Sequence, residues 1–239
     1  MREVKFDNLD SMLPENLLLI LYHETRDSKY KLAADRIRQR FDTYLRTKDG
    51  GFWHASSKSR EWQLWGDGVF MSLPLLVRYG RMFGDSKYTN DEAVHQLLPY
   101  ASHLNDPRTG LMFHAYDESG QSTWADTETR HSPEIWRRAM GWFGMTLIEV
   151  LELLPRDHPM RPLLIRKSYY SFELGPGIRT ICEGTNVADL AYYFARKRNT
   201  NDFHGLGAFL IMNEKFMNKT LKGSKSLWRP PHNPRLSFF

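Results

Sequence analysis

One carboxylate at the start of a long apolar segment is the first candidate for chemistry in this sequence. Residues 63–84 read QLWGDGVFMSLPLLVRYGRMFG, in which Asp67 lies between two glycines and follows Trp65 by two positions. A carboxyl group beside an aromatic ring, at the mouth of a buried helix, could act as a general acid or base. Alternatively, Asp67 is only a helix N-cap, whose oxygen accepts a hydrogen bond from a backbone N–H. These residues alone favour the N-cap.

A second candidate pair lies further along the chain. Arg138 and Trp142 are four positions apart, so on a helix they share one face. An arginine on a buried face needs an anion, and the planar guanidinium suits a carboxylate. That anion could belong to a ligand, or it could be an internal partner such as Glu134 or Asp67.

Tryptophan is concentrated in one part of the chain, since six of the seven lie between residues 53 and 142. Aromatic rings stack on the apolar faces of sugar rings, while charged and amide groups fix the hydroxyls. The six could form such a platform, although core packing is the simpler interpretation of any single one. They are Trp53, Trp62, Trp65, Trp124, Trp136 and Trp142.

The composition argues against several other classes of protein. His54, His114 and His131 are not at metal-ligand spacings, so we expect no metal and no cofactor. The single cysteine, Cys182, suits a reducing compartment. No segment resembles a signal peptide or a membrane span, so we expect a cytoplasmic protein that does not bind membranes.

The net charge of +5 does not indicate nucleic-acid binding, because the basic residues are unevenly placed. Six of the 33 cations follow Glu214 and no acid does, which leaves 27 cations and 28 acids in residues 1–214. The basicity therefore belongs to the C-terminal part of the chain, which includes a basic tail over residues 221–239 that also contains prolines. Such a tail is most often solvated.

The hydrophobic pattern predicts helices over residues 9–25, 31–45, 67–84 and from there to about 104, with a kink at Pro74. The tetrapeptide DSKY occurs at 27–30 and again at 85–88, each time between an apolar helix and a more polar one. A third unit is predicted to start with Ser132 as its cap and to run to about residue 155. Further helices are predicted over 160–172, 187–198 and 204–219, with a loop over 173–186.

No stretch alternates as a strand does, so the predicted fold class is all-α. Repeated hairpins of one apolar and one amphipathic helix predict an α/α toroid with the apolar helices inside. The long loops at 46–66 and 103–131 precede inner helices, so their side chains should meet at one mouth of the toroid. These side chains are His54, Trp62, Trp65, His114, Trp124 and Asp126.

Four blocks, in order, resemble the unsaturated rhamnogalacturonyl hydrolases of glycoside hydrolase family 105, which are relatives of the family 88 unsaturated glucuronyl hydrolases. The blocks are WQLWGDGVFMSLPLL, LMFHAYDE, SPEIWRRAMGWFGMTLIEVLELLP and EGTNVADLAYYFARKRNTNDFHGLGAFL. With LDSMLPENLLLILY and LRTKDGGFWH, the resemblance covers most of residues 9–155 and 180–212. It implies an (α/α)6 toroid as one catalytic domain over residues 1–220. It also implies release of a 4,5-unsaturated galacturonyl residue from the non-reducing end of pectin oligosaccharides.

The resemblance also implies roles for individual residues. Asp67 matches the aspartate that protonates C4 of the sugar and then draws a proton from the water that adds at C5. A proton donor thereby becomes the preferred interpretation of Asp67. Burial and a nearby Asp10 would raise the pKa of Asp67, whereas Arg138 and the helix N-terminus would lower it. The substrate-binding residues expected on this basis are Asp10, Trp65, His114, Arg138, Trp142 and Trp136.

The sequence departs from the family pattern in three places. The family motif HGWDE reads HAYDE at 114–118, and Leu13 and Glu15 replace small and polar residues. Fewer helices are predicted than six hairpins require, with gaps at the N-terminus and between about 156 and 180. We therefore expect a shortened or incomplete toroid, either open or closed by self-association.

Two alternatives to the hydrolase follow. One is an inactive toroid that only binds acidic sugars. The other is an inverting glycosidase that uses Asp10 and Asp67 as acid and base.

Overall fold

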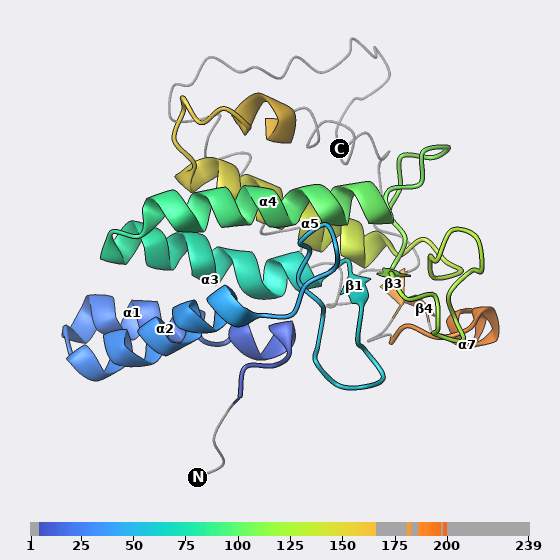
Figure 1. Ribbon diagram of the computed structural model, residues 1–239, viewed down its shortest axis with the longest axis horizontal. Helices are drawn as coiled ribbons and strands as arrows, with labels where there is room; N and C mark the ends of the chain where they lie inside the picture. The colour runs from blue at the N-terminus through green and yellow to red at the C-terminus, as the bar shows by residue number, and fades with distance from the viewer. Residues whose placement is uncertain (1–4, 166–180, 183–185, 197, 200–239) are drawn as a thin grey trace.

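The computed structural model describes residues 5–165, 181–182, 186–196 and 198–199. Two packed helix pairs come first, α1 (Asn16–Thr25) with α2 (Ser28–Arg40) and α3 (Gly68–Phe83) with α4 (Ser86–Leu104) (Figure 1). Helix α5 (Arg137–Leu153) and a helical segment at 161–165 follow. The smaller elements are η1 (Leu9–Met12), η2 (Phe41–Thr43), α7 (Leu190–Ala195) and the strands β1 (Gln63–Trp65), β2 (Ala115–Asp117), β3 (Ile181–Cys182) and β4 (Arg198–Asn199).

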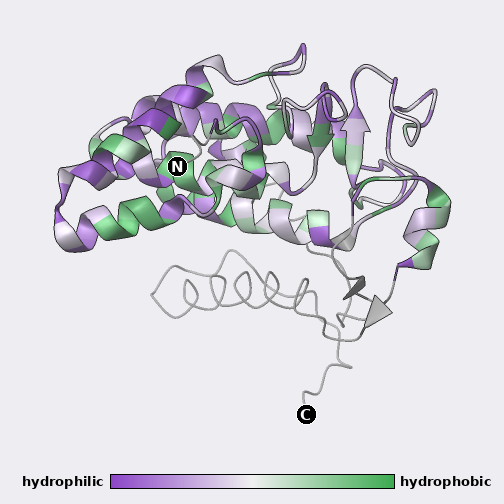
Figure 2. Ribbon diagram, turned by 90° about the horizontal axis from the view of Figure 1, so that it is seen from below, coloured by the Kyte–Doolittle hydropathy of each residue, from purple (hydrophilic) through white to green (hydrophobic). Residues whose placement is uncertain are grey.

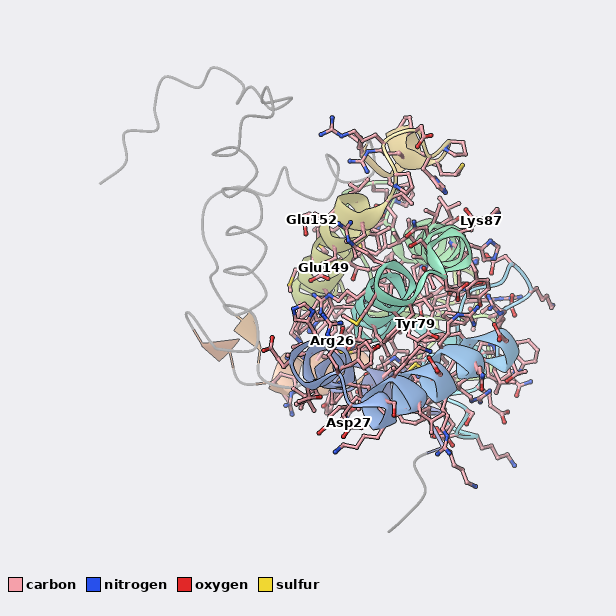
Figure 3. All side chains as sticks on the ribbon, turned by 90° about the vertical axis from the view of Figure 1, so that its left-hand side faces the viewer. Arg26, Asp27, Tyr79, Lys87, Glu149 and Glu152 are labelled. Carbon is pink, nitrogen blue, oxygen red and sulfur yellow. The ribbon has the colours of Figure 1, made fainter. Side chains whose placement is uncertain are left out.

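The repeated DSKY tetrapeptide begins the second helix of each pair, directly after a tight turn. At the first turn Arg26 is left-handed (φ 58°), and Asp27 caps α2 by accepting a hydrogen bond from the Lys29 amide at 3.0 Å. At the second turn Gly84 has a φ of 86°, which glycine adopts without a steric penalty. Figure 3 views this end of the molecule, with Arg26 and Asp27 labelled. The predicted helical hairpins are thus present.

The apolar helices α1, α3 and α5 pack side by side, as the prediction of an inner layer requires, because α3 contacts both of the others. Arg78 of α3 joins all three. Its guanidinium donates to Oδ1 of Asn16 on α1 at 3.0 Å and to the two carboxylate oxygens of Glu149 on α5 at 2.7 and 2.6 Å. On the outer side, the Tyr79 hydroxyl donates to Oδ1 of Asp35 on α2 at 2.7 Å. Figure 3 shows Tyr79 and Glu149 on adjacent helices.

Helices α3 and α4 approach each other most closely at Gly80. A β-carbon there would lie 1.8 Å from Oγ1 and 2.8 Å from Cβ of Thr89. We therefore expect Gly80→Ala to lower the free energy of unfolding by about 1–3 kcal/mol, as overpacking does. Urea unfolding tests this, and Thr89→Ala in the same background should recover part of the loss. Equal stability of Gly80→Ala and the wild type would contradict the tight packing of these helices.

The helix predicted over residues 9–25 is divided in the structure. The turn η1 ends at Met12 and α1 begins at Asn16. Pro14 lies between them, and a proline has no N–H with which to continue helical hydrogen bonding. Residues 9–25 therefore form two elements.

The apolar residues of the first two helices are less buried than predicted. Leu19 is buried, but Leu17 and Ile20 are exposed by 55% and 56%, and Leu32 of α2 by 57%. Figure 2 shows hydrophobic residues among hydrophilic ones along these helices. The predicted second helix also ends early, at Arg40, where the tighter η2 takes over.

The predicted helix start at Ser132 is wrong, because α5 begins at Arg137. The preceding residues are extended and pair with the strand region before β2. The His114 amide donates to the Glu134 carbonyl at 3.3 Å, and the Trp136 amide donates to the Met112 carbonyl at 3.1 Å. The Ser132 hydroxyl accepts from the Ala115 amide at 3.1 Å instead of capping a helix.

The two long loops meet, as predicted. Strand β1 pairs antiparallel with β2, and Trp65 lies opposite Ala115. In Figure 1 this pairing and α7 lie at the end of the helices opposite the α1–α2 turn. Asp126 does not take part, because it is exposed and caps its own turn, accepting from the amide of Thr129.

The structure describes only part of the chain beyond residue 155, so the helices predicted there are tested only in part. The helix predicted over 187–198 is shorter, since α7 spans Leu190–Ala195, and that over 160–172 is seen at 161–165. The helix over 204–219, the tail and most of the predicted loop over 173–186 lie outside the described residues. Within the described ranges, no helix has both the length and the apolar character needed to cross a bilayer.

Candidate active site

Asp67 lies at the turn from β1 into α3. The two glycines that flank it allow the chain to pass close to neighbouring elements. A β-carbon on Gly66 would lie 2.5 Å from Cβ of Ala139 on α5, and one on Gly68 would lie 2.8 Å from the Tyr100 hydroxyl. The Gly-Asp-Gly sequence therefore positions the Asp67 backbone tightly between α4 and α5.

Asp67 does not act as a helix cap. Its backbone is helical (φ −83°, ψ −19°) and its side chain makes no capping hydrogen bond. Its Oδ1 is buried and has no hydrogen-bond partner among the described residues. Burial raises the pKa of this carboxyl above its ordinary value; the charge of Asp10 adds to the rise, and His54 and Arg138 oppose it. The result is a carboxyl group that keeps its proton to higher pH than a free aspartate, as a general acid requires.

His54 lies between Asp67 and a second carboxylate. Its Nδ1 is 3.9 Å from Oδ1 of Asp67, and its Nε2 is 3.5 Å from Oδ2 of Asp10. Asp10 belongs to η1, which is held here because the Leu9 amide donates to the His54 carbonyl at 3.0 Å. Burial opposes ionisation of Asp10, but the hydrogen bond and charge of His54 prevail and lower its pKa. The pKa values of the two aspartates are thus shifted in opposite directions, so Asp67 favours the protonated acid and Asp10 favours the carboxylate.

A row of aromatic rings leads away from this pair. His54 stacks on Trp65 with centroids 4.5 Å apart and planes at 8°, and Trp65 meets His114 edge-on at 5.6 Å. His114 in turn lies 3.9 Å from Trp136. We call His54, Trp65, His114 and Trp136 the aromatic row. The Arg138 guanidinium ends it, with Cζ 4.2 Å from the Trp136 ring centroid.

His114, in the middle of this row, is fully buried. Burial lowers its pKa well below the ordinary value, and the charges of Arg138 and His54 act in the same direction, so the imidazole is neutral. Its Nδ1 is 2.8 Å from the hydroxyl of Tyr193 on α7. Nε2 is buried without a hydrogen-bond partner in the part of the chain that the structure describes.

The structure brings together most of the predicted site residues but not all. Asp67, Asp10, Trp65, His114, Trp136 and Arg138 lie around His54 or along the aromatic row. Trp142 stacks instead on Phe70, with centroids 4.6 Å apart, one turn into α3.

The six tryptophans do not form one platform. Trp53 pairs with Trp62 at 4.5 Å, and this pair is separate from the contacts that make up the aromatic row. Trp62 is also partly exposed, at 37%. The tryptophans therefore make separate ring contacts instead of one stacking surface.

Two residues of the site were missed as site residues. His54 was predicted only to lie in a loop at the mouth, and its signal was the sequence GGFWH within a block that carries the family resemblance. Tyr193 lies in the aromatic-rich AYYF at 191–194 of another such block. In the described ranges, no three His, Cys, Asp or Glu side chains are grouped as metal ligands would be.

Helical hairpins around an apolar inner layer, with paired carboxyl groups beside aromatic rings at the loop end, have the architecture of the α/α-toroid glycoside hydrolases. The family model for Glycosyl Hydrolase Family 88 matches residues 2–170, and the chain belongs to this family.

Individual relatives agree with this assignment. Protein Atu3128 of Agrobacterium fabrum is 39% identical over 87 residues, 36% of this chain and 36% of that protein. The unsaturated rhamnogalacturonyl hydrolase YesR of Bacillus subtilis is 28% identical over 146 residues, 59% of this chain and 40% of that protein. The chain therefore spans well under half the length of these curated relatives.

A solved structure supports the fold. The glycoside hydrolase from family 105 of C. acetobutylicum superposes with a TM-score of 0.77 at 24% identity, over 91% of this chain and 82% of that chain. The predicted all-α toroid and the resemblance to families 105 and 88 are confirmed.

Proposed function

We propose that the protein releases a 4,5-unsaturated galacturonyl residue from the non-reducing end of pectin (rhamnogalacturonan) oligosaccharides by hydrating the C4=C5 double bond. The observation that carries this proposal is the buried Asp67 carboxyl group with its raised pKa, next to His54 and Asp10. The name of YesR supports the substrate class.

In this mechanism the chemistry starts on the double bond and not on the glycosidic bond. The protonated Asp67 donates its proton to C4, and the ring oxygen stabilises the positive charge that forms at C5. A water then adds to C5 while the Asp67 carboxylate takes up one of its protons, which restores the acid. The resulting hemiketal opens to a ketone, and the hemiacetal left at C1 releases the neighbouring sugar. One water is consumed for each glycosidic bond that breaks.

The other residues bind and orient the substrate. Arg138, held over Trp136, is the cation for the uronate carboxylate. Charged Asp10 accepts hydrogen bonds from sugar hydroxyls, and the ring of Trp65 provides an apolar face. Neutral His114 offers one ring nitrogen to the substrate. Trp142, stacked on Phe70, borders the start of α3.

The geometry favours hydration over conventional inversion. An inverting glycosidase needs two carboxyl groups roughly 6.5–9.5 Å apart with a water between them. Here the imidazole of His54 lies between the two carboxyl groups, with Nε2 3.5 Å from Oδ2 of Asp10 and Nδ1 3.9 Å from Oδ1 of Asp67, which supports hydration.

The test uses the ultraviolet absorbance of the conjugated uronate. Purified protein with unsaturated rhamnogalacturonan disaccharide is expected to remove this absorbance as the double bond is hydrated. Release of sugar from the saturated disaccharide, with no need for a double bond, would instead indicate inversion. Binding of the unsaturated disaccharide by calorimetry without any fall in absorbance would leave only the inactive, acidic-sugar-binding toroid.

The pH dependence tests the pairing of the two aspartates. A general acid loses activity as the pH rises through its pKa, so Asp67 should set the alkaline limb of kcat/KM. Because the Asp10 charge raises the Asp67 pKa and the His54 charge lowers it, Asp10→Asn should move that limb to lower pH and His54→Gln to higher pH. Asp91→Asn, on the exposed side of α4, is the control and should leave the limb in place. If the alkaline limb stays in place in both Asp10→Asn and His54→Gln, the assignment of Asp67 as the general acid is contradicted.

A further inference from the structure

Tyr193 connects α7 to the middle of the aromatic row. Asp189 caps α7 by accepting a hydrogen bond from the Tyr192 amide at 2.8 Å. Tyr193 is buried, and its ring meets His114 edge-on with centroids 5.8 Å apart and planes at 71°. Its hydroxyl lies 2.8 Å from Nδ1 of the same ring. One side chain therefore makes both a packing contact and a hydrogen bond to His114.

Two further rings contact the His114 ring. Trp136 and Trp65 lie on it at 3.9 and 5.6 Å. The His114 carbonyl accepts from the Gly66 amide at 2.9 Å, which fixes the backbone but not the imidazole. Within the described residues, the His114 ring is hydrogen-bonded to Tyr193 through Nδ1, and its Nε2 has no hydrogen-bond partner.

A neutral imidazole carries one hydrogen and one lone pair, and the partner of one nitrogen decides which nitrogen holds the hydrogen. Burial keeps His114 neutral by lowering its pKa. Burial likewise raises the pKa of Tyr193, so the phenol keeps its hydrogen. A phenol O–H is a stronger hydrogen-bond donor than the N–H of a neutral imidazole, and the bare imidazole nitrogen is a stronger acceptor than the phenol oxygen. The hydrogen of the Tyr193 hydroxyl is therefore directed to Nδ1 of His114 across the 2.8 Å contact.

We propose that Tyr193 is a positioning residue that holds His114 in the tautomer with its hydrogen on Nε2. The site then presents a fixed N–H donor at a nitrogen that has no protein partner among the described residues. The acceptor is an oxygen of the uronyl group, its ring oxygen or a hydroxyl, and this identity of the ligand rests on the proposed function. The tautomer itself does not depend on that function.

The experiment compares two tyrosines on the same helix. Tyr193→Phe removes only the hydroxyl that contacts His114. Tyr192→Phe is the matched control, because that hydroxyl accepts from the Asn186 amide at 3.2 Å and does not contact the aromatic row. Both proteins are made with ¹⁵N-labelled histidine, the His114 signals are identified by their loss in His114→Asn, and circular dichroism confirms folding.

The wild type and Tyr192→Phe should show the hydrogen on Nε2 of His114, whereas Tyr193→Phe should show a mixture of tautomers. Tyr193→Phe should also lower kcat about 10-fold, as the loss of one aligned hydrogen bond does, with a smaller change in KM. A hydrogen on Nδ1 in the wild type, or an unchanged tautomer in folded Tyr193→Phe, overturns the proposal. If the tautomer changes in Tyr193→Phe but the wild type does not act on the disaccharide, the positioning role is supported and only the proposed function is refuted.

Discussion

Asp67→Asn is expected to lower turnover of the unsaturated disaccharide by about 100- to 10,000-fold, the usual contribution of a general acid. An amide of the same shape fills the buried turn between β1 and α3 but has no proton to give to C4. Binding should be retained, because Arg138 and the aromatic row remain. Absorbance gives kcat, and calorimetry gives the dissociation constant of the bound disaccharide. Asp91→Asn is the control for the loss of one carboxylate.

The stability of the same variant separates a catalytic acid from a helix cap. Loss of a cap lowers the free energy of unfolding by about 0.5–2 kcal/mol. The raised pKa of Asp67 means that the folded protein binds this proton more tightly than the unfolded chain, so stability falls as the pH rises from the ordinary aspartate pKa through the raised one. Asp67→Asn removes that cost and should be at least as stable as the wild type at neutral pH. A less stable variant with full activity would return Asp67 to the role of a cap.

Local sequence was sufficient where the pattern was strong. The bounds of α3 and α4 follow from an apolar run, the DSKY turn and Gly84, whose left-handed backbone ends the helix. The Gly-Asp-Gly sequence likewise predicted that Asp67 lies at the start of α3. The direction of the Asp67 pKa shift did not follow from sequence, because burial, Asp10, His54 and Arg138 act in opposite senses and their distances decide the outcome.

Contacts between distant segments could not be predicted in this way. His54 reaches Asp10 because Asn8 bridges to Ala55 and the Leu9 amide bonds to the His54 carbonyl, and no periodicity records that crossing. Tyr193 and His114 are 79 positions apart in the chain. The same limit explains the error at Ser132, whose cap signal was overridden by extended pairing with Ala115 of β2.

Arg138→Gln is expected to raise KM for the unsaturated disaccharide by about 10- to 150-fold, with a smaller change in kcat. A hydrogen bond to a charged group contributes about 1.5–3 kcal/mol, which corresponds to that factor. The guanidinium lies over Trp136, and its charge lowers the pKa of both Asp67 and His114, so it is close enough to act on both ends of the site. A carboxylate bound there would lie within electrostatic reach of both Asp67 and His114.

The uronate methyl ester makes this prediction specific to the carboxylate. The wild type should prefer the free acid to the ester, and Arg138→Gln should lose that preference because the ester has no charge for the guanidinium to bind. Arg138→Lys keeps the charge without the planar fork, so its preference for the free acid should lie between those of the wild type and Arg138→Gln. Arg26→Gln removes a cation that also lies near an aromatic ring, Tyr22, at 5.8 Å, but at the far end of the helices, so it should behave as the wild type. If Arg138→Gln still prefers the acid as strongly as the wild type does, the carboxylate is bound by another residue, and the orientation of the sugar over Asp67 has to be assigned anew.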